Sequence, residues 1–267
     1  MLKLRVLTAA ALLLLLLACM FLLPGIGRQV ALIIPLLIAG HEWSRLAGFG
    51  RAAEVAFLCT LVAGNTFIWM VSRPGPENAG FATVASHAVY ACSVAFWLII
   101  VPNWLWLKAQ VRNRFALAAA GLLVLLPTWL ALAQLQRSPY LLLSLLAVVW
   151  IADTAAYFSG RALGRHKLAP AISPGKTWEG VAGAFAAVTV YAVALHFMRF
   201  PTGGFDFVMV AFFGMTAFSI VGDLFESWLK RSAGVKDSGV ILPGHGGMLD
   251  RIDGMVSALP LAALLFT

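Results

Sequence analysis

The chain has 267 residues, of which 61% are hydrophobic and only 11% charged, and its formal net charge is +8. A soluble domain carries about 25% charged residues, so this composition excludes an ordinary soluble protein. The positive charges lie in short segments between apolar runs rather than on one polar face, which favours a membrane protein over a nucleic-acid-binding protein.

The first apolar segment allows two interpretations. Lys3 and Arg5 precede a leucine-rich run that reaches Cys19, which resembles a signal peptide or a lipoprotein signal. The run continues past Cys19 without a polar spacer, so a first transmembrane helix that stays in the mature protein is the preferred interpretation. Cys19, Cys59 and Cys92 show no metal-ligand spacing, and we interpret them as small buried hydrophobic residues.

Nine apolar segments are long enough to cross a bilayer as helices, which requires about 20 residues. Helices are expected because a backbone in lipid has to satisfy its own hydrogen bonds. The last segment is short and the seventh is rich in alanine and glycine, so eight spans are the alternative. The segments are 6–23, 28–47, 53–72, 85–103, 115–135, 140–160, 178–198, 205–228 and 251–267. The predicted fold class is an all-α polytopic membrane protein, a bundle of about nine transmembrane helices.

The distribution of Lys and Arg predicts the orientation of this bundle. Most of them lie in the N-terminus and in the even-numbered connections, which the positive-inside rule places in the cytoplasm. We expect one integrated membrane domain, with N-terminal transmembrane helices in residues 1–140 and catalytic helices and cytoplasmic loops in residues 141–267.

Polar side chains inside predicted spans mark candidate sites, because they are costly in lipid. His41 and Glu42 lie near the end of the second segment and are expected to make interhelical hydrogen bonds. Asp153 lies inside the sixth segment, with Tyr157 one turn later on the same face. Asp153 is expected to belong to a functional site or to support one.

The loop after the sixth segment contains the tripeptide Gly175-Lys176-Thr177, which resembles part of a P-loop. The P-loop pattern requires glycine where Pro170 stands, and no βα unit precedes it, so the P-loop is excluded. Ser173, Lys176 and Thr177 can still bind phosphate just before a helix. A basic cytoplasmic loop near lipid headgroups is the alternative.

A polar stripe ends the eighth segment. Asp223, Glu226, Ser227 and Lys230 stand at i, i+3, i+4 and i+7, which places them on one helix face. Such a stripe is expected to face the protein interior or an aqueous cavity rather than lipid. An internal Asp–Lys pair that only staples the helix is the alternative.

Two further carboxylates, Asp250 and Asp253, begin the last segment three residues apart. They repel unless a cation lies between them or one is protonated, and oxygen ligands of this kind suit Mg²⁺. Helix capping would explain Asp250 alone but not the pair. Arg251, between them, is expected to point elsewhere, towards a phosphate.

A glycine-rich loop lies between these two acidic helix ends. Gly246 and Gly247 permit close backbone approach and anion-binding amides. His245 either contacts phosphate or caps the loop.

This pattern resembles the phosphatidate cytidylyltransferases, also called CDP-diacylglycerol synthases. Their signature has Ser-x-x-Lys-Arg, Lys-Asp, a glycine-rich His-Gly-Gly and Asp-Arg-x-Asp, and the stretches VWIADTAAYFSGRALGRHKLAP and ISPGKTWEG are also similar to the family. The resemblance is strong over residues 148–253 and loose before them. The matching signature positions are Ser227, Lys230, Arg231, Lys236, Asp237, Gly239, Pro243, His245, Gly246, Gly247, Asp250, Arg251 and Asp253.

The resemblance implies transfer of the cytidylyl group of CTP to phosphatidate, which gives CDP-diacylglycerol and pyrophosphate in phospholipid biosynthesis. Both substrates are anions, so a divalent metal and basic side chains are expected to neutralise their repulsion. Mg²⁺, with a second cation as an option, is expected on Asp223, Asp250 and Asp253. The expected catalytic residues are Asp223, Lys230, Asp250, Arg251 and Asp253. The expected substrate-binding residues are Asp153, Ser173, Lys176, Thr177, Glu226, Ser227, Arg231, Lys236, Asp237, His245, Gly246 and Gly247.

The expected partners are CTP, phosphatidate, membrane lipids and a second copy of the chain, without nucleic acid. The expected location is the bacterial cytoplasmic membrane, with the active site facing the cytoplasm. A CTP-dependent lipid kinase of the polyprenol type is the alternative enzyme, and a transporter, with intramembrane acids that carry ions, is the alternative of another class.

Overall fold

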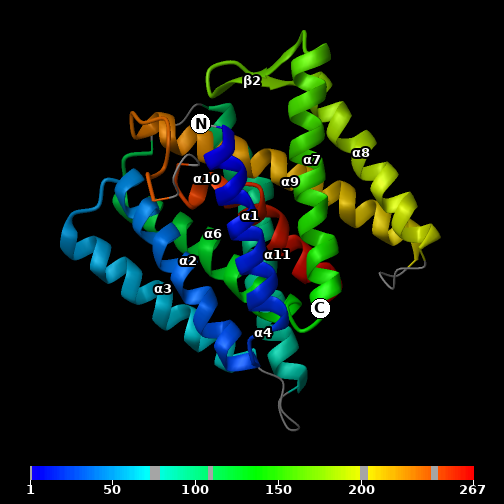
Figure 1. Cartoon of the computed structure of the whole chain (residues 1–267). Helices are drawn as coiled ribbons and strands as arrows, with labels where there is room; N and C mark the ends of the chain where they lie inside the picture. The colour runs from blue at the N-terminus through cyan, green and yellow to red at the C-terminus, as the bar shows by residue number, and fades with distance from the viewer. Residues whose placement is uncertain (1, 73–78, 108–110, 199–203, 242–245) are drawn as a thin grey trace.

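Helices form nearly all of the computed structural model, which describes residues 2–72, 79–107, 111–198, 204–241 and 246–267 (Figure 1). The N-terminal part contains α1 (Leu2–Phe21), α2 (Gly25–Leu46), α3 (Arg51–Val71), α4 (Ala79–Ala95), the π-helical turn η1 (Phe96–Ile100), α5 (Val101–Trp106) and α6 (Arg114–Leu135). The C-terminal part contains α7 (Pro139–Leu163), β1 (Lys167–Ala169), β2 (Ser173–Thr177), α8 (Trp178–Phe197), α9 (Phe205–Ser232), α10 (Leu249–Ile252) and α11 (Met255–Phe266).

Six helices in the described parts of the chain are long and apolar enough to cross a membrane. They are Arg51–Val71, Gly80–Trp106, Arg114–Leu135, Pro139–Leu163, Trp178–Phe197 and Phe205–Ser232, and Ala10–Phe21 and Met255–Phe266 are shorter apolar helices. The prediction of an all-α membrane protein is therefore confirmed. The count of nine spans and the cytoplasmic N-terminus stay predictions.

The helix boundaries have local causes. The side chain of Asn113 caps α6 by accepting the backbone N–H groups of Phe115 and Ala116. Thr177 caps α8 by accepting the N–H of Gly180 at 3.1 Å. Pro139 occupies the first turn of α7, where the missing N–H costs nothing.

The N-terminal and C-terminal parts share one packed interior. Helix α11 packs against α9, α6 and α4, while α7 and α8 pack along each other. Aromatic rings join the parts, because Phe225 and Trp228 of α9 pack with Trp104 of α5, and Phe225 also contacts Trp43 of α2. Helix α9 is therefore fixed by both parts, which matters because it carries the polar stripe.

The hairpin β1–β2 is the exception to the all-helical prediction. Its two strands are antiparallel and pair Lys167 with Thr177 and Ala169 with Ser173. Helix α7 ends at Leu163, where Gly164 turns the backbone into an extended conformation, and Pro170 and Pro174 disfavour a helix in the stretch that follows. The hairpin projects from the end of the bundle towards which the N-terminus of α1 also lies (Figure 1).

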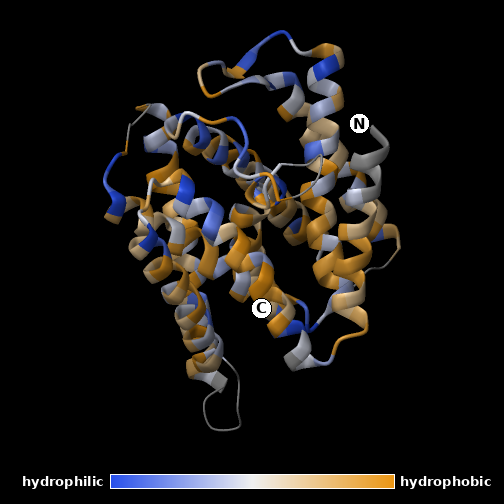
Figure 2. Ribbon diagram, turned by 60° about the vertical axis from the view of Figure 1, so that its left-hand side comes forward, coloured by the Kyte–Doolittle hydropathy of each residue, from blue (hydrophilic) through white to orange (hydrophobic). Residues whose placement is uncertain are grey.

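The prediction that the cysteines are buried is wrong for two of them. Cys59 and Cys92 are exposed, and Cys19 is half-buried. Most residues of the long helices are hydrophobic, as the colouring of Figure 2 shows, and many large apolar side chains are exposed. In a membrane bundle an apolar residue can face lipid, so hydrophobicity alone does not predict burial.

Candidate functional site

A cavity of about 600 Å³ opens between the hairpin and helices α7, α8 and α9. Its walls combine charged side chains with small residues that leave room beside the backbone. The polar lining residues are Asp153, Tyr157, Arg161, Lys167, Ser173, Lys176, Thr177 and Asp223. Five predicted site residues from three separate parts of the sequence thus share one cavity: Asp153, Ser173, Lys176, Thr177 and Asp223.

An ion pair closes one side of this cavity. Lys176 Nζ of β2 lies 2.6 Å from Asp223 Oδ2 of α9, and both side chains keep part of their surface exposed. Ser227 donates a long hydrogen bond of 3.5 Å to the other oxygen of Asp223. The hairpin is thereby held to α9 through the residue that begins the polar stripe.

Asp253, between α10 and α11, lies within electrostatic range of Asp153 and Asp223, which line the cavity. A Cβ atom on Gly222 would collide with the carbonyl oxygen of Asp253, so α9 packs tightly on this segment. The negative charges of Asp223 and Asp153 and the positive charge of Lys176 act on Asp253. Asp153, Asp223 and Asp253 are here called the cavity acids: Asp153 and Asp223 line the cavity, and Asp253 lies within electrostatic range of both.

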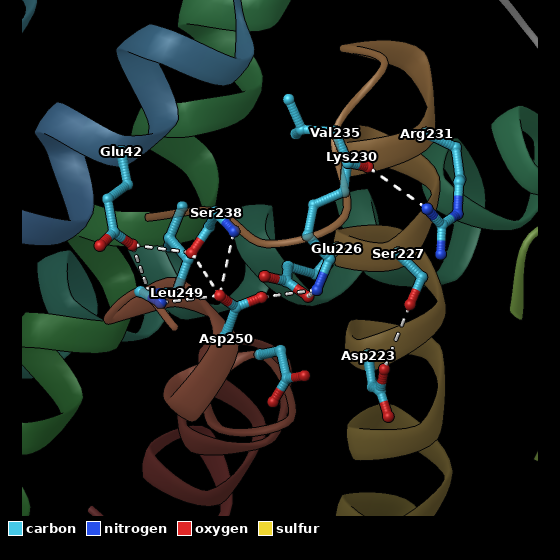
Figure 3. Close-up of polar contacts among 12 residues, drawn as sticks. Glu42, Asp223, Glu226, Ser227, Lys230, Arg231, Val235, Ser238, Leu249 and Asp250 are labelled. Atoms are coloured by element: carbon cyan, nitrogen blue, oxygen red, sulfur yellow. Dashed lines mark hydrogen bonds and ion pairs between the residues drawn. The ribbon is translucent and has the colours of Figure 1, made fainter. Parts of the chain in front are cut away.

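The second half of the polar stripe belongs to a different cluster (Figure 3). Lys230 Nζ lies 2.5 Å from Glu226 Oε2 on the same helix and 2.6 Å from Asp250 Oδ1. The side chains of Lys230, Glu226 and Asp250 are 13%, 7% and 6% exposed. Apart from this ion pair with Lys230, no hydrogen bond to either oxygen of Glu226 is found within the described chain, so the carboxylate depends on Lys230.

Asp250 is more fully satisfied than Glu226. Its Oδ2 accepts hydrogen bonds from the N–H of Ser238 at 3.0 Å, the hydroxyl of Ser238 at 3.0 Å and the N–H of Gly247 at 2.8 Å. Burial tends to raise the pKa of Asp250, but the hydrogen bonds from Lys230 and Gly247 outweigh burial and lower the pKa to about 2. Asp250 is therefore a charged group whose two oxygens are both engaged.

The remaining predicted site residues lie around the loop between α9 and α10. Arg231, Lys236, Asp237 and Arg251 are exposed, Gly246 is half-buried and Gly247 is buried. Pro243 and His245 lie outside the described residues. Arg231 donates a hydrogen bond to the nearby carbonyl of Val235 at 3.4 Å.

The predicted metal ligands divide between the two clusters. Asp223 and Asp253 belong to the cavity acids, whereas Asp250 lies on Lys230. Among the described residues, no three His, Cys, Asp or Glu side chains are gathered closely enough to hold a metal ion. The cavity acids are nevertheless oxygen donors with excess negative charge, which is the donor chemistry that suits Mg²⁺.

Two residues that line the cavity, Arg161 and Lys167, were not among the predicted site residues. Arg161 follows Tyr157 by one turn and donates to its hydroxyl at 3.2 Å, so helical spacing from Asp153 could have found it. Lys167 also lines the cavity, at the start of β1. The prediction of interhelical hydrogen bonds is confirmed for both His41 and Glu42. His41 contacts Glu54 of α3 at 2.5 Å, and Glu42 accepts the N–H of Leu249 of α10; Glu42 also accepts the hydroxyl of Ser238, which no local pattern could have predicted.

Comparisons with known proteins place this geometry in context. The family model described as "Cytidylyltransferase family" matches residues 3–267. A Haemophilus influenzae protein named phosphatidate cytidylyltransferase is 33% identical over 289 residues, which cover 100% of this chain and 99% of that protein. A Pseudomonas aeruginosa protein of the same name is 37% identical over 276 residues, covering 99% and 97%. A Brucella melitensis protein of that name is 54% identical over 123 residues, covering 46% and 44%.

Proposed function

Because the chain belongs to the cytidylyltransferase family and is a nucleotidyltransferase, we propose that it transfers the cytidylyl group of CTP to phosphatidate. The products are CDP-diacylglycerol, a precursor in phospholipid biosynthesis, and pyrophosphate. Full-length similarity to two proteins named phosphatidate cytidylyltransferase supports this assignment. One observation assigns the reaction to a place in the structure. A charged cavity lies at the end of apolar helices, where a water-soluble nucleotide and a lipid can meet.

The reaction joins two anions, and the cavity residues address that difficulty. An oxygen of the lipid phosphate forms a bond to the α-phosphorus of CTP while the bond to the β-phosphate oxygen breaks. The attacking oxygen is already ionised, so no general base is required. Arg161, Lys167 and Lys176 line the cavity and would neutralise phosphate charge on the substrates and on the departing pyrophosphate.

The oxygen donors Asp223 and Asp253, with Asp153 beside them, fit Mg²⁺. When bound, this ion would neutralise phosphate charge and make the α-phosphorus more electrophilic. Asp250 was predicted as a third ligand, but its oxygens carry Lys230, Ser238 and Gly247. We therefore assign Asp250 the role of holding Lys230 at the end of the polar stripe.

The lipid would enter sideways from the bilayer. Tyr157 and Phe158 of α7 are exposed, and Tyr157 lines the cavity, so an apolar surface leads to the charged lining. Acyl chains would stay on this surface while the phosphate reaches Arg161. We propose that the cavity faces the cytoplasm of a bacterial inner membrane and that the chain forms a homodimer. The distribution of Lys and Arg supports the orientation.

One assay tests the reaction and separates it from its alternatives. Detergent-solubilised protein receives phosphatidate, Mg²⁺ and CTP labelled in the α-phosphate, and we expect label in the organic phase together with pyrophosphate. Label that stays in the aqueous phase as CDP would indicate a lipid kinase and would contradict the proposal.

A matched pair of variants links the activity to the cavity. Asp223→Asn is expected to lower kcat about 100-fold or more, a loss of roughly 3 kcal/mol of transition-state stabilisation. Asp206→Asn, an exposed Asp in the first turn of the same helix α9, is the control that keeps activity. If Asp223→Asn were as active as Asp206→Asn, the assignment of Asp223 to the active site would be wrong.

A further inference from the structure

Glu42 of α2 is a completely buried carboxylate outside the cavity described above. It points from the N-terminal part of the chain into the loop that joins α9 to α10 (Figure 3). Its Oε1 accepts the N–H of Met248 at 2.9 Å, and its Oε2 accepts the N–H of Leu249 at 2.8 Å and the hydroxyl of Ser238 at 2.9 Å. One side chain thus binds both ends of the loop.

The loop is shaped to fit this carboxylate. A Cβ atom on Gly239 would collide with Glu42 Oε1, and a Cβ on Gly247 would lie only 2.5 Å from Glu42 Oε2. The backbone therefore approaches Glu42 more closely than any residue with a side chain would permit. Gly239 and Gly247 therefore allow the loop backbone to pack directly against the carboxylate of Glu42.

The negative charge of Glu42 is essential to the contact. The structure gives Glu42 no ion pair among the described residues, so its charge is met by two backbone N–H groups and one hydroxyl. A buried carboxylate is costly unless it is satisfied in this way. In Glu42→Gln an NH₂ group replaces one carboxylate oxygen. This donor would then face the backbone N–H of Met248 or Leu249, which is also a donor, and a hydrogen bond would be lost.

A continuous set of contacts leads from Glu42 to the polar stripe. The hydroxyl of Ser238 lies 2.9 Å from Glu42 Oε2 and 3.0 Å from Asp250 Oδ2, so it joins the two carboxylates. Asp250 in turn holds Lys230 at 2.6 Å. A displacement of Glu42 therefore moves Ser238, and with it the group that fixes the direction of Lys230.

We propose that Glu42 is a positioning residue for nucleotidyl transfer. It holds Ser238, Met248 and Leu249 on the two sides of the loop, and through Ser238 it fixes Asp250, which pairs with Lys230 at the end of the polar stripe. This inference rests on the proposed function for its catalytic consequence, but its structural consequence, a loop held by Glu42, is measurable without any substrate.

The test compares Glu42→Gln with Glu54→Gln in the full-length protein in detergent. Glu54 is the matched control, because it is a carboxylate of the same part of the chain that pairs with His41 and does not touch the loop. We expect Glu42→Gln to lower kcat about 10- to 100-fold, as for other groups that orient a site residue, with the KM for CTP changed less than about threefold. Amide hydrogen exchange over residues 238–241 and 246–250 should accelerate in Glu42→Gln and stay unchanged in Glu54→Gln.

Each outcome decides the proposal. A folded Glu42→Gln with wild-type kcat and wild-type loop exchange overturns it. If Glu42→Gln does not fold, Ser238→Ala removes only the joining hydroxyl, and a loss of kcat at an unchanged melting temperature supports the proposal, whereas wild-type kcat overturns it. If the wild-type protein forms no CDP-lipid while Glu42→Gln still accelerates loop exchange, the proposed reaction fails and the role of Glu42 in the loop survives.

Discussion

Replacing Lys230 with methionine should strongly destabilise the protein, because one cation serves two buried carboxylates. Lys230→Met leaves Glu226 and Asp250, which are 7% and 6% exposed, without their common partner. Breaking one buried ion pair typically costs about 3–5 kcal/mol, and the loss of both contacts places the expected cost near the upper end, about 5 kcal/mol. Asp250 keeps three hydrogen bonds from Ser238 and Gly247, whereas Glu226 keeps none, so most of this cost should reside on Glu226.

The free energy of unfolding in detergent micelles, measured by denaturant titration, tests this reasoning. Lys230→Met/Glu226→Leu should regain at least about 2 kcal/mol relative to Lys230→Met, because it removes the orphaned charge. Lys230→Met/Asp250→Asn should regain less. Lys236→Met, an exposed lysine in the adjoining loop, should change stability by less than about 0.5 kcal/mol. A Lys230→Met protein as stable as wild type would refute the buried three-residue cluster.

Three further outcomes concern the cavity. Lys176→Met should lower kcat/KM about 10- to 100-fold in a pyrophosphate-release assay, because it deletes a charged contact at Asp223. Arg161→Ala should raise the KM for phosphatidate about tenfold while kcat is retained, and Arg165→Ala, an exposed arginine that does not line the cavity, should not. Removal of divalent cations by a chelator should abolish turnover without unfolding the protein, and added Mg²⁺ should restore it; activity that persists under chelation would contradict the metal assignment.

The helices were predictable because their signal is local. Apolar runs of spanning length, ended by residues such as Asn113 and Pro139, specify where each helix begins, and the described helices fall within a few residues of the predicted segments. The same local rule fails for Cys59 and Cys92, since it cannot distinguish a lipid-facing side from a buried one. The fold class followed from hydrophobicity, but the packing did not.

The grouping of the site residues was only partly predictable. Helical spacing correctly placed Asp223, Glu226 and Lys230 on one stripe of α9. It could not predict with which residue each of these side chains forms an ion pair. Asp223 pairs with Lys176 of the hairpin, and Lys230 pairs with Asp250 near the last helix. These choices depend on how separate helices pack, which one sequence does not encode in any short pattern.

The two acidic clusters differ in how their charge is balanced, and this difference explains why a chain rich in apolar residues retains both. Glu226 and Asp250 share Lys230 as their cation, and Asp250 and Glu42 also accept hydrogen bonds from backbone N–H groups of residues 238 and 247–249, so these acids give the ends of the loop a defined shape. The cavity acids have Lys176 beside three carboxylates, which leaves a net negative charge that a cation from solution can satisfy. We infer that the cluster around Lys230 makes the structure rigid. The cavity acids, with their excess negative charge, attract the cation that we propose for the reaction. On this basis, neutralising a cavity acid should impair turnover more than folding, and neutralising a member of the Lys230 cluster should impair folding at least as much as turnover.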